Sequence, residues 1–153
     1  MFRWLWVAVA VLLLDQATKL IALAKLALHE SVALAPFLNL TLVYNKGAAF
    51  GFLSSASGWQ NLFFIGVALV ACAVILYLLR RLGDNYRLLA VALMLVLGGA
   101  IGNLLDRLLY GHVVDFIDVY YRGWHWPAFN VADSAITVGV ALLALRLLTE
   151  RKV

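Results

Sequence analysis

Two aspartates are placed where a pair of carboxyl groups could perform acid–base chemistry. Asp115 follows a long apolar segment, in GHVVDF, and Asp133 opens another, in FNVADS. Two adjacent carboxyl groups cannot easily both ionise, so one of them keeps its proton. The ionised group can then take a proton from water while the protonated group donates to a carbonyl oxygen. This chemistry is general acid–base hydrolysis without a covalent intermediate.

The same positions have other interpretations. Asn130 and Asp133 have the spacing of a capping box at a helix start, where the helix dipole also favours an acid. Asp118 is an alternative to Asp115, because both lie in the same loop and nothing in the periodicity separates them. The sequence therefore allows the pairing of Asp115 with Asp133 without demonstrating it.

Other catalytic chemistries have little support. Three serines precede the second apolar segment, but no His or Lys is arranged to activate them. The run GGAIG is not a dinucleotide fingerprint, because no strand precedes it. One cysteine and three histidines lack zinc-type spacing, so we expect neither a metal nor a cofactor. These residues are Ser54, Ser55, Ser57, Cys72, His29, His112 and His125.

The composition indicates which elements must position the aspartates. The chain is 65% hydrophobic and only 13% charged, whereas globular domains are about a quarter charged. A soluble fold of this size could not hide so much apolar surface, but lipid accepts it. Four continuous apolar segments are each near the ~20 residues that cross a ~30 Å hydrocarbon core as a helix. They cover residues 4–28, 59–79, 88–109 and 131–148.

Basic residues between the segments predict the orientation. Seven of the 12 Lys and Arg residues lie before the first segment, between the second and third, or at the end of the chain. By the positive-inside rule, both termini are cytoplasmic and residues 29–58 and 110–130 form outer loops. The orientation of the spans thus explains the net charge of +4, which does not indicate nucleic-acid binding. The seven are Arg3, Arg80, Arg81, Arg87, Arg146, Arg151 and Lys152.

We predict an all-α membrane protein with four transmembrane helices and a small extracytoplasmic β-sheet in the first outer loop. Residues 1–153 are treated as a single domain. The sheet is predicted from residues 36–53, where strand-like apolar residues precede a turn-rich stretch at 45–51. Aromatic residues in the second outer loop suit the headgroup layer, with a lid over the substrate as the alternative. They are Tyr120, Tyr121, Trp124, Trp126 and Phe129.

Ionisable side chains within the spans need an explanation, because they are costly in lipid. Asp15 and Lys19 are four residues apart and share one helical face. They form either a self-neutralising pair that points into the bundle or a brace for something in its interior. Asn103, Asp106 and Arg107 also share a face, and their simplest interpretation is an ion cluster at a helix end.

Two glycines in the third span predict helix packing. Gly98 and Gly102 are four residues apart and so lie on one side of a helix. Small residues at this spacing let a neighbouring helix approach closely. We therefore expect another span to pack against this side of the third.

Five motifs, spread over nearly the whole chain, resemble those of the lipoprotein signal peptidase (signal peptidase II) family. Each is weak alone, but together, in order on a four-span plan, they are specific. No position that the family uses for chemistry departs from its pattern. The motifs are DQATK at 15–19, NKGAAFG at 45–51, GGAIGNLLDR at 98–107, VVDF at 113–116 and FNVAD at 129–133.

The resemblance implies an aspartic endopeptidase of the bacterial inner membrane, multi-pass, with its active site near the periplasmic face. It would remove signal peptides from prolipoproteins whose cysteine carries a diacylglyceryl group, cutting just before that cysteine. Asp115 and Asp133 would be the catalytic dyad. Positions around the dyad correspond to Asn45, Gly99, Asn103, Arg107, Asn130 and Ala132, and structural polar positions to Asp15, Lys19 and Asp106.

The resemblance also implies the partners of the protein. Diacylglyceryl-modified prolipoproteins and membrane lipid are expected to bind, globomycin is expected to inhibit, and we expect a monomer. Two other functional classes compete. A transporter or proton channel is suggested by charges in the spans, but no inverted repeat is apparent. A non-catalytic scaffold would need no pairing of Asp115 with Asp133.

Overall fold

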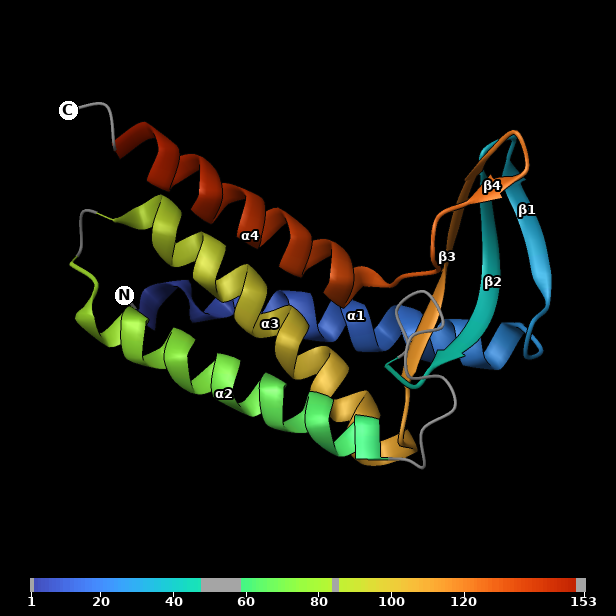
Figure 1. Ribbon diagram of the computed structural model, residues 1–153, viewed down its shortest axis with the longest axis horizontal. Coiled ribbons are helices and arrows are strands. Elements are labelled where there is room, and N and C mark those ends of the chain that lie inside the picture. The colour runs from blue at the N-terminus through green and yellow to red at the C-terminus, as the bar shows by residue number, and fades with distance from the viewer. Residues whose placement is uncertain (1, 48–58, 84–85, 151–153) are drawn as a thin grey trace.

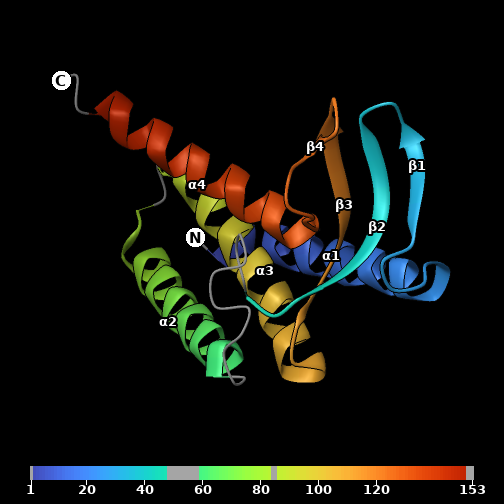
Figure 2. The same cartoon turned by 45° about the vertical axis from the view of Figure 1, so that its right-hand side comes forward.

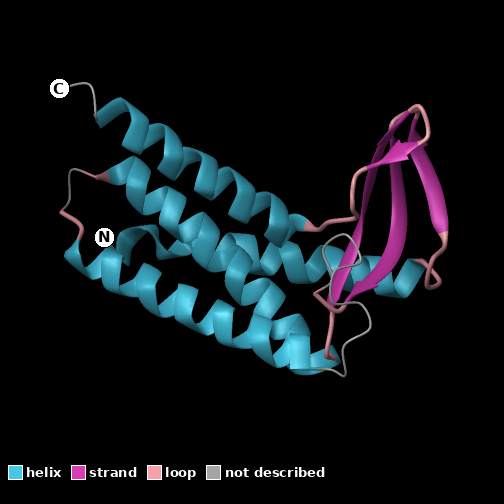
Figure 3. Ribbon diagram, viewed as in Figure 1, coloured by secondary structure: helices cyan, strands magenta, loops and turns pink. Residues whose placement is uncertain are grey.

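The computed structural model describes residues 2–47, 59–83 and 86–150. Four long helices form a bundle, and a small sheet stands at one end of it (Figures 1 and 3). In chain order the elements are η1 (Phe2–Trp4), α1 (Leu5–Lys25), β1 (Ser31–Ala35), β2 (Leu38–Asn45), α2 (Trp59–Arg81), α3 (Arg87–Tyr110), β3 (Val113–Tyr121), β4 (Trp124–His125) and α4 (Val131–Glu150). Some residues singled out in the sequence lie outside the described ranges: residues 48–53, Ser54, Ser55, Ser57, Arg151 and Lys152.

The four predicted spans are confirmed as helices. α1, α2, α3 and the Val131–Thr149 part of α4 are each long and apolar enough to cross a membrane. The first ends at Lys25 and not at residue 28, because Leu26 adopts an extended backbone. α3 is the central helix: in the apolar 18-residue stretch of each helix, 61% of the residues are buried in α3, against 28%, 11% and 17% in α1, α2 and α4. The other helices pack on α3 and leave apolar surface for lipid.

The sheet is more extensive than the first outer loop alone, because β3 and β4 come from the second. Its four strands are antiparallel in the order β1–β2–β3–β4. β2 and β3 pair from Leu38 with Val119 to Asn45 with Val113. β3 is buried along most of its length, so it lacks the apolar–polar alternation that reveals a surface strand in a sequence. Figure 2 shows the sheet where α3 ends and α4 begins.

The aromatic residues of the second outer loop surround β4. Trp124 and Trp126 are exposed and meet edge to face, with ring centroids 5.7 Å apart. Phe129 instead pairs its backbone with Ile117 of β3. The two tryptophans are therefore free to contact the headgroup layer, which stays a prediction, while Phe129 belongs to the sheet.

Two apolar clusters hold the architecture together. The larger lies among α1, α2 and α3 and includes Val7, Ile75, Leu79 and Met94. The smaller joins the sheet to the end of α1, where Leu42 of β2 and Val114 and Phe116 of β3 surround Ala22. The second cluster fixes the sheet against the bundle and so sets the position of the residues that follow Val114.

The predicted close helix approach at Gly98 and Gly102 is confirmed. A Cβ atom on Gly98 would lie 2.6 Å from the carbonyl oxygen of Ala8, and one on Gly102 would lie 2.5 Å from Asp15 Oδ2. Both neighbours belong to α1, so this side of α3 is the face on which α1 packs.

A methyl group tests this contact. Gly98→Ala should lower the free energy of unfolding by about 1–3 kcal/mol, because overpacking forces α1 away from α3. The matched control is Gly66→Ala on α2, where an added Cβ meets no atom within 4 Å. There the better helix propensity of alanine should leave stability unchanged or raise it by about 0.5–1 kcal/mol. Thermal unfolding in detergent compares the two; equal midpoints would contradict the close approach.

Candidate active site

Asp115 lies on β3 with its carboxyl group almost fully buried, at 1% exposure. Two amide side chains donate to it. Asn45 Nδ2, at the end of β2, is 3.1 Å from Oδ2, and Asn130 Nδ2 is 2.7 Å from Oδ1. The antiparallel register of β2 and β3 brings Asn45 to this end of β3.

Asp133 lies in the first turn of α4 and is half-buried. Its backbone N–H donates to Asn130 Oδ1 at 2.9 Å, and its Oδ2 accepts from the Asn130 backbone N–H at 3.3 Å. The predicted capping box is therefore confirmed. Its other oxygen, Oδ1, accepts from Asn103 Nδ2 of α3 at 2.8 Å. Capping thus occupies one oxygen of this carboxyl group and leaves the other directed at α3.

The two carboxyl groups are joined by a pair of amides. Asn130 Nδ2, which donates to Asp115, is also 3.2 Å from Asn103 Oδ1, and Asn103 donates to Asp133. Burial, and then the nearby negative charge of Asp133, raise the pKa of Asp115 to about 7. Near neutral pH Asp115 therefore exchanges readily between its protonated and ionised forms, beside a second carboxyl group.

Asp118, the alternative to Asp115, has different partners. Its carboxylate lies 2.8 Å from His125 Nδ1 and accepts from Asn39 Nδ2 at 2.9 Å. Side chains three positions apart on a strand point to opposite faces. Asp118 therefore faces the other side of β3, and the geometry brings Asp115, and not Asp118, towards Asp133.

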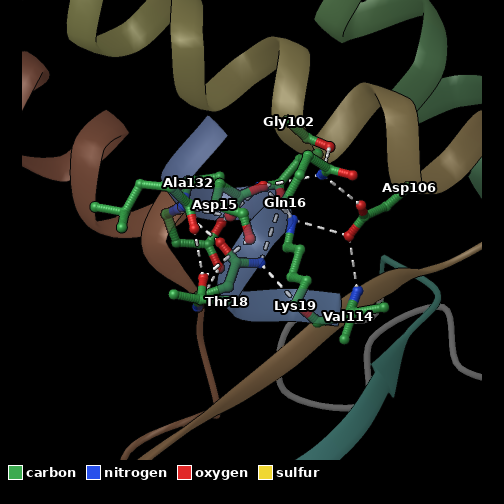
Figure 4. A network of polar contacts seen from close by, with 12 residues as sticks. Asp15, Gln16, Thr18, Lys19, Gly102, Asp106, Val114 and Ala132 are labelled. Carbon is green, nitrogen blue, oxygen red and sulfur yellow. Dashed lines mark hydrogen bonds and ion pairs between the residues drawn. The ribbon is translucent and has the colours of Figure 1, made fainter. Parts of the chain in front are cut away.

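The ammonium group of Lys19 is buried, and Figure 4 shows it between Asp15 and Asp106. Lys19 Nζ is 2.8 Å from Asp15 Oδ2, 2.8 Å from Asp106 Oδ2 and 3.0 Å from Asn103 Oδ1. All three of its N–H groups can thus be satisfied. The predicted pairing of Asp15 with Lys19 is confirmed, and Asp106 and Asn103 of α3 complete it.

The carboxylates around Lys19 also hold the backbone next to each candidate catalytic residue. Asp15 Oδ1 accepts from the Ala132 N–H at 2.9 Å, and Asp106 Oδ2 accepts from the Val114 N–H at 3.0 Å. Ala132 immediately precedes Asp133, and Val114 immediately precedes Asp115. One charge cluster therefore positions both ends of the pair.

The remaining predicted residues support this cluster from α3. A Cβ on Gly99 would lie 2.5 Å from the carbonyl oxygen of Ala132, so glycine lets α3 approach the first turn of α4. Arg107 donates from Nη1 to the Asn103 carbonyl oxygen at 3.3 Å, and its guanidinium lies over the Phe64 ring. Gly99 therefore sets a helix spacing, and Arg107 contacts the backbone of Asn103.

Several contributors were not identified from the sequence. Gln16 Nε2 donates to Asp15 and Asp106 and lies 3.3 Å from the Gly102 carbonyl oxygen. Gln16 is the second residue of the DQATK motif, and this motif was the available signal for it. A cavity of about 330 Å³ opens beside Asp115, between the end of β2 and the segment before α4. Its lining includes Tyr44, Lys46, Pro127 and Ala128 as well as Asn45 and Asp115.

This architecture is that of bacterial membrane enzymes. The chain is similar to a solved structure described as a bacterial membrane enzyme at 2.3 Å resolution, with a TM-score of 0.89 and 35% identity, covering 99% of this chain and 91% of the other. A second, at 1.9 Å resolution, has a TM-score of 0.83 and 36% identity over 97% and 94% of the two chains.

Residues 7–149 match the family described as signal peptidase (SPase) II, and the chain belongs to this family. It is 55% identical to the lipoprotein signal peptidase of Burkholderia mallei over 140 residues, which cover 92% of this chain and 84% of the relative. The lipoprotein signal peptidase of Paraburkholderia phymatum is 56% identical over the same shares. The chain is therefore a membrane protease. This family membership excludes the transporter and scaffold interpretations.

Removing the buried ammonium should destabilise the protein strongly. Lys19→Met leaves Asp15 and Asp106 without their cation, so we expect a loss of about 3–5 kcal/mol in the free energy of unfolding. Lys25→Met is the control, because Lys25 is an exposed residue at the end of the same helix. Denaturation in detergent measures both. A Lys19→Met protein as stable as the control would show that the cluster does not hold the site together.

Proposed function

We propose that this enzyme removes the signal peptide from prolipoproteins whose cysteine carries a diacylglyceryl group, cutting the peptide bond before that cysteine. Membership of the family supports the cleavage of lipoprotein signal peptides. A substrate with acyl chains reaches the enzyme from within the bilayer. The candidate site, at the ends of α3 and α4 where those spans meet the sheet, suits such a substrate.

The observation that carries the mechanism is the pair of carboxyl groups joined by Asn103 and Asn130. Asp115 and Asp133 serve in this proposal as acid and base. Asp133 acts as the base: in its carboxylate form it takes a proton from water as the water oxygen bonds to the scissile carbonyl carbon. Asp115, which keeps its proton below about pH 7, donates to the carbonyl oxygen. The carbon–nitrogen bond then breaks as the leaving nitrogen receives the proton that Asp133 took, and one hydroxyl group of the intermediate returns a proton to Asp115 as the carbonyl re-forms.

The surroundings of Asp115 support binding of an extended peptide. The cavity beside it is lined by residues at the end of β2 and by Pro127 and Ala128. Asn45 lines the cavity and also donates to Asp115, so it links the substrate region to the acid. Two fixed amides hold the carboxyl group before the substrate arrives, which lowers the reorganisation needed during the reaction.

The proposal also covers the oligomeric state of the enzyme, its membrane and its orientation. The chain acts as a single domain, as a monomer, in the bacterial inner membrane. Both termini are cytoplasmic and the site is near the periplasmic face, because the basic residues gather at the opposite end. Globomycin inhibits the enzyme, and neither a metal nor a cofactor takes part.

Conservative substitutions test the pair. Asp115→Asn and Asp133→Asn should each lower the rate of cleavage by about 10²–10⁴-fold or more, the usual contribution of acid–base catalysis. Asp118→Asn should leave cleavage near the wild-type rate, because Asp118 binds Asn39 and His125 instead. The assay uses a purified diacylglyceryl-modified prolipoprotein, with globomycin as inhibitor. Cleavage that persists in either Asp115→Asn or Asp133→Asn would remove that residue from the pair.

The raised pKa of Asp115 predicts a fall in activity on the alkaline side. Below about pH 7 Asp115 keeps its proton, and above it the acid is lost, so kcat/KM should decrease as pH rises through about 7. The hydrogen bond from Asn45 lowers the pKa of Asp115. Asn45→Ala should therefore move the decrease to higher pH. An alkaline limb at the same pH in wild type and Asn45→Ala would argue against Asp115 as the acid.

A further inference from the structure

A basic and aromatic cavity lies at the end of the bundle opposite the candidate active site. It has a volume of about 310 Å³ and is lined by Arg3, Trp4, Trp6 and Arg87. Arg3 and Trp4 belong to η1, Trp6 to the first turn of α1, and Arg87 is the first residue of α3. η1 packs against α3, and Figure 1 shows this end of the bundle remote from the sheet. None of these four residues takes part in the proposed reaction.

The cavity has the charge to hold an anion. Two guanidinium groups line it, and the Arg3 guanidinium lies 5.7 Å from the Trp4 ring centroid. Among the side chains that the structure describes within residues 3–47, 59–83 and 86–149, neither Arg3 nor Arg87 has a carboxylate partner. The first turns of α1 and α3 contain no acidic residue, so their positive dipole ends are not offset there. Further arginines gather at this end: Arg80, Arg81 and Arg146.

The position of the cavity in the membrane and its tryptophan lining both indicate that the anion is a lipid. The cavity lies where the first and third spans begin. This is the level of the headgroups, where tryptophan rings place their apolar face against acyl chains. Arginine forks match the oxygens of a phosphate group, and basic pockets between transmembrane helices bind acidic headgroups.

We propose that this cavity binds the headgroup phosphate of an anionic phospholipid between Arg3 and Arg87, with the exposed ring of Trp6 against the glycerol and upper acyl chains. The bound lipid joins η1 to the start of α3 and so holds α1 against α3 at the end remote from the active site. With the proposed orientation, the lipid belongs to the cytoplasmic leaflet. The site does not depend on the peptidase mechanism.

The test measures binding of phosphatidylglycerol to the purified full chain. Thermal unfolding and native mass spectrometry follow the protein in neutral detergent with added phosphatidylglycerol, phosphatidylcholine or inorganic phosphate. Phosphatidylglycerol should raise the unfolding midpoint and remain bound, and phosphatidylcholine should do neither. Arg3→Lys/Arg87→Lys keeps every charge but loses the planar forks, so phosphatidylglycerol affinity should fall about tenfold. The matched control is Arg80→Lys/Arg81→Lys, at the same end but outside the cavity, and it should bind like wild type.

Several outcomes would overturn the site. An equal loss of phosphatidylglycerol binding in both double variants would assign the effect to general surface charge. Stabilisation by inorganic phosphate equal to that by phosphatidylglycerol would identify a free-anion site and not a lipid site. Should Arg3→Lys/Arg87→Lys fail to fold, Trp6→Ala provides the second readout, because Trp6 is mostly exposed and its removal leaves both arginines in place. Unchanged phosphatidylglycerol affinity in Trp6→Ala would likewise contradict the proposed arrangement.

Discussion

The ammonium group of Lys19 is the constraint on which the rest of this structure depends. A cation buried among lipid-facing helices is tolerated only when each of its N–H groups has a partner and its charge is balanced. Asp15, Asp106 and Asn103 meet that requirement within hydrogen-bonding distance. One partner comes from α1 itself and two from α3, so satisfying the charge also fixes how α1 lies against α3. The glycines of α3 make the approach sterically possible.

The carboxylates that balance the charge of Lys19 also accept hydrogen bonds from backbone N–H groups of other elements. Asp15 binds the amide of Ala132, and Asp106 binds the amide of Val114. The result is that α4 and β3, which meet the bundle at different points, deliver Asp133 and Asp115 to the same place. The amides of Asn103 and Asn130 then complete the link between the two carboxyl groups. Stability of the bundle and geometry of the proposed reaction are therefore properties of one network.

The two ends of the bundle carry different kinds of side chain. One end carries the sheet and the carboxyl groups of Asp115 and Asp133, where we propose that the substrate binds. The other carries arginines and tryptophans around a cavity that suits a phospholipid headgroup. α2 is the least buried helix, and its lipid-facing surface shows that the bilayer, and not a protein core, receives most of its side chains.

The sequence by itself determined the features that repeat within one element. Apolar segment length defined the four spans, i and i+4 spacing paired Asp15 with Lys19, and local spacing identified the capping box of Asn130 and Asp133. Family motifs then indicated Asp115 as the second acid. Only the tertiary structure decided that β3 joins the sheet of the first outer loop, that Asp118 turns to His125, and that Gln16 enters the Lys19 network. Those contacts join residues far apart in the chain, and they depend on strand register and helix packing, which local periodicity does not encode.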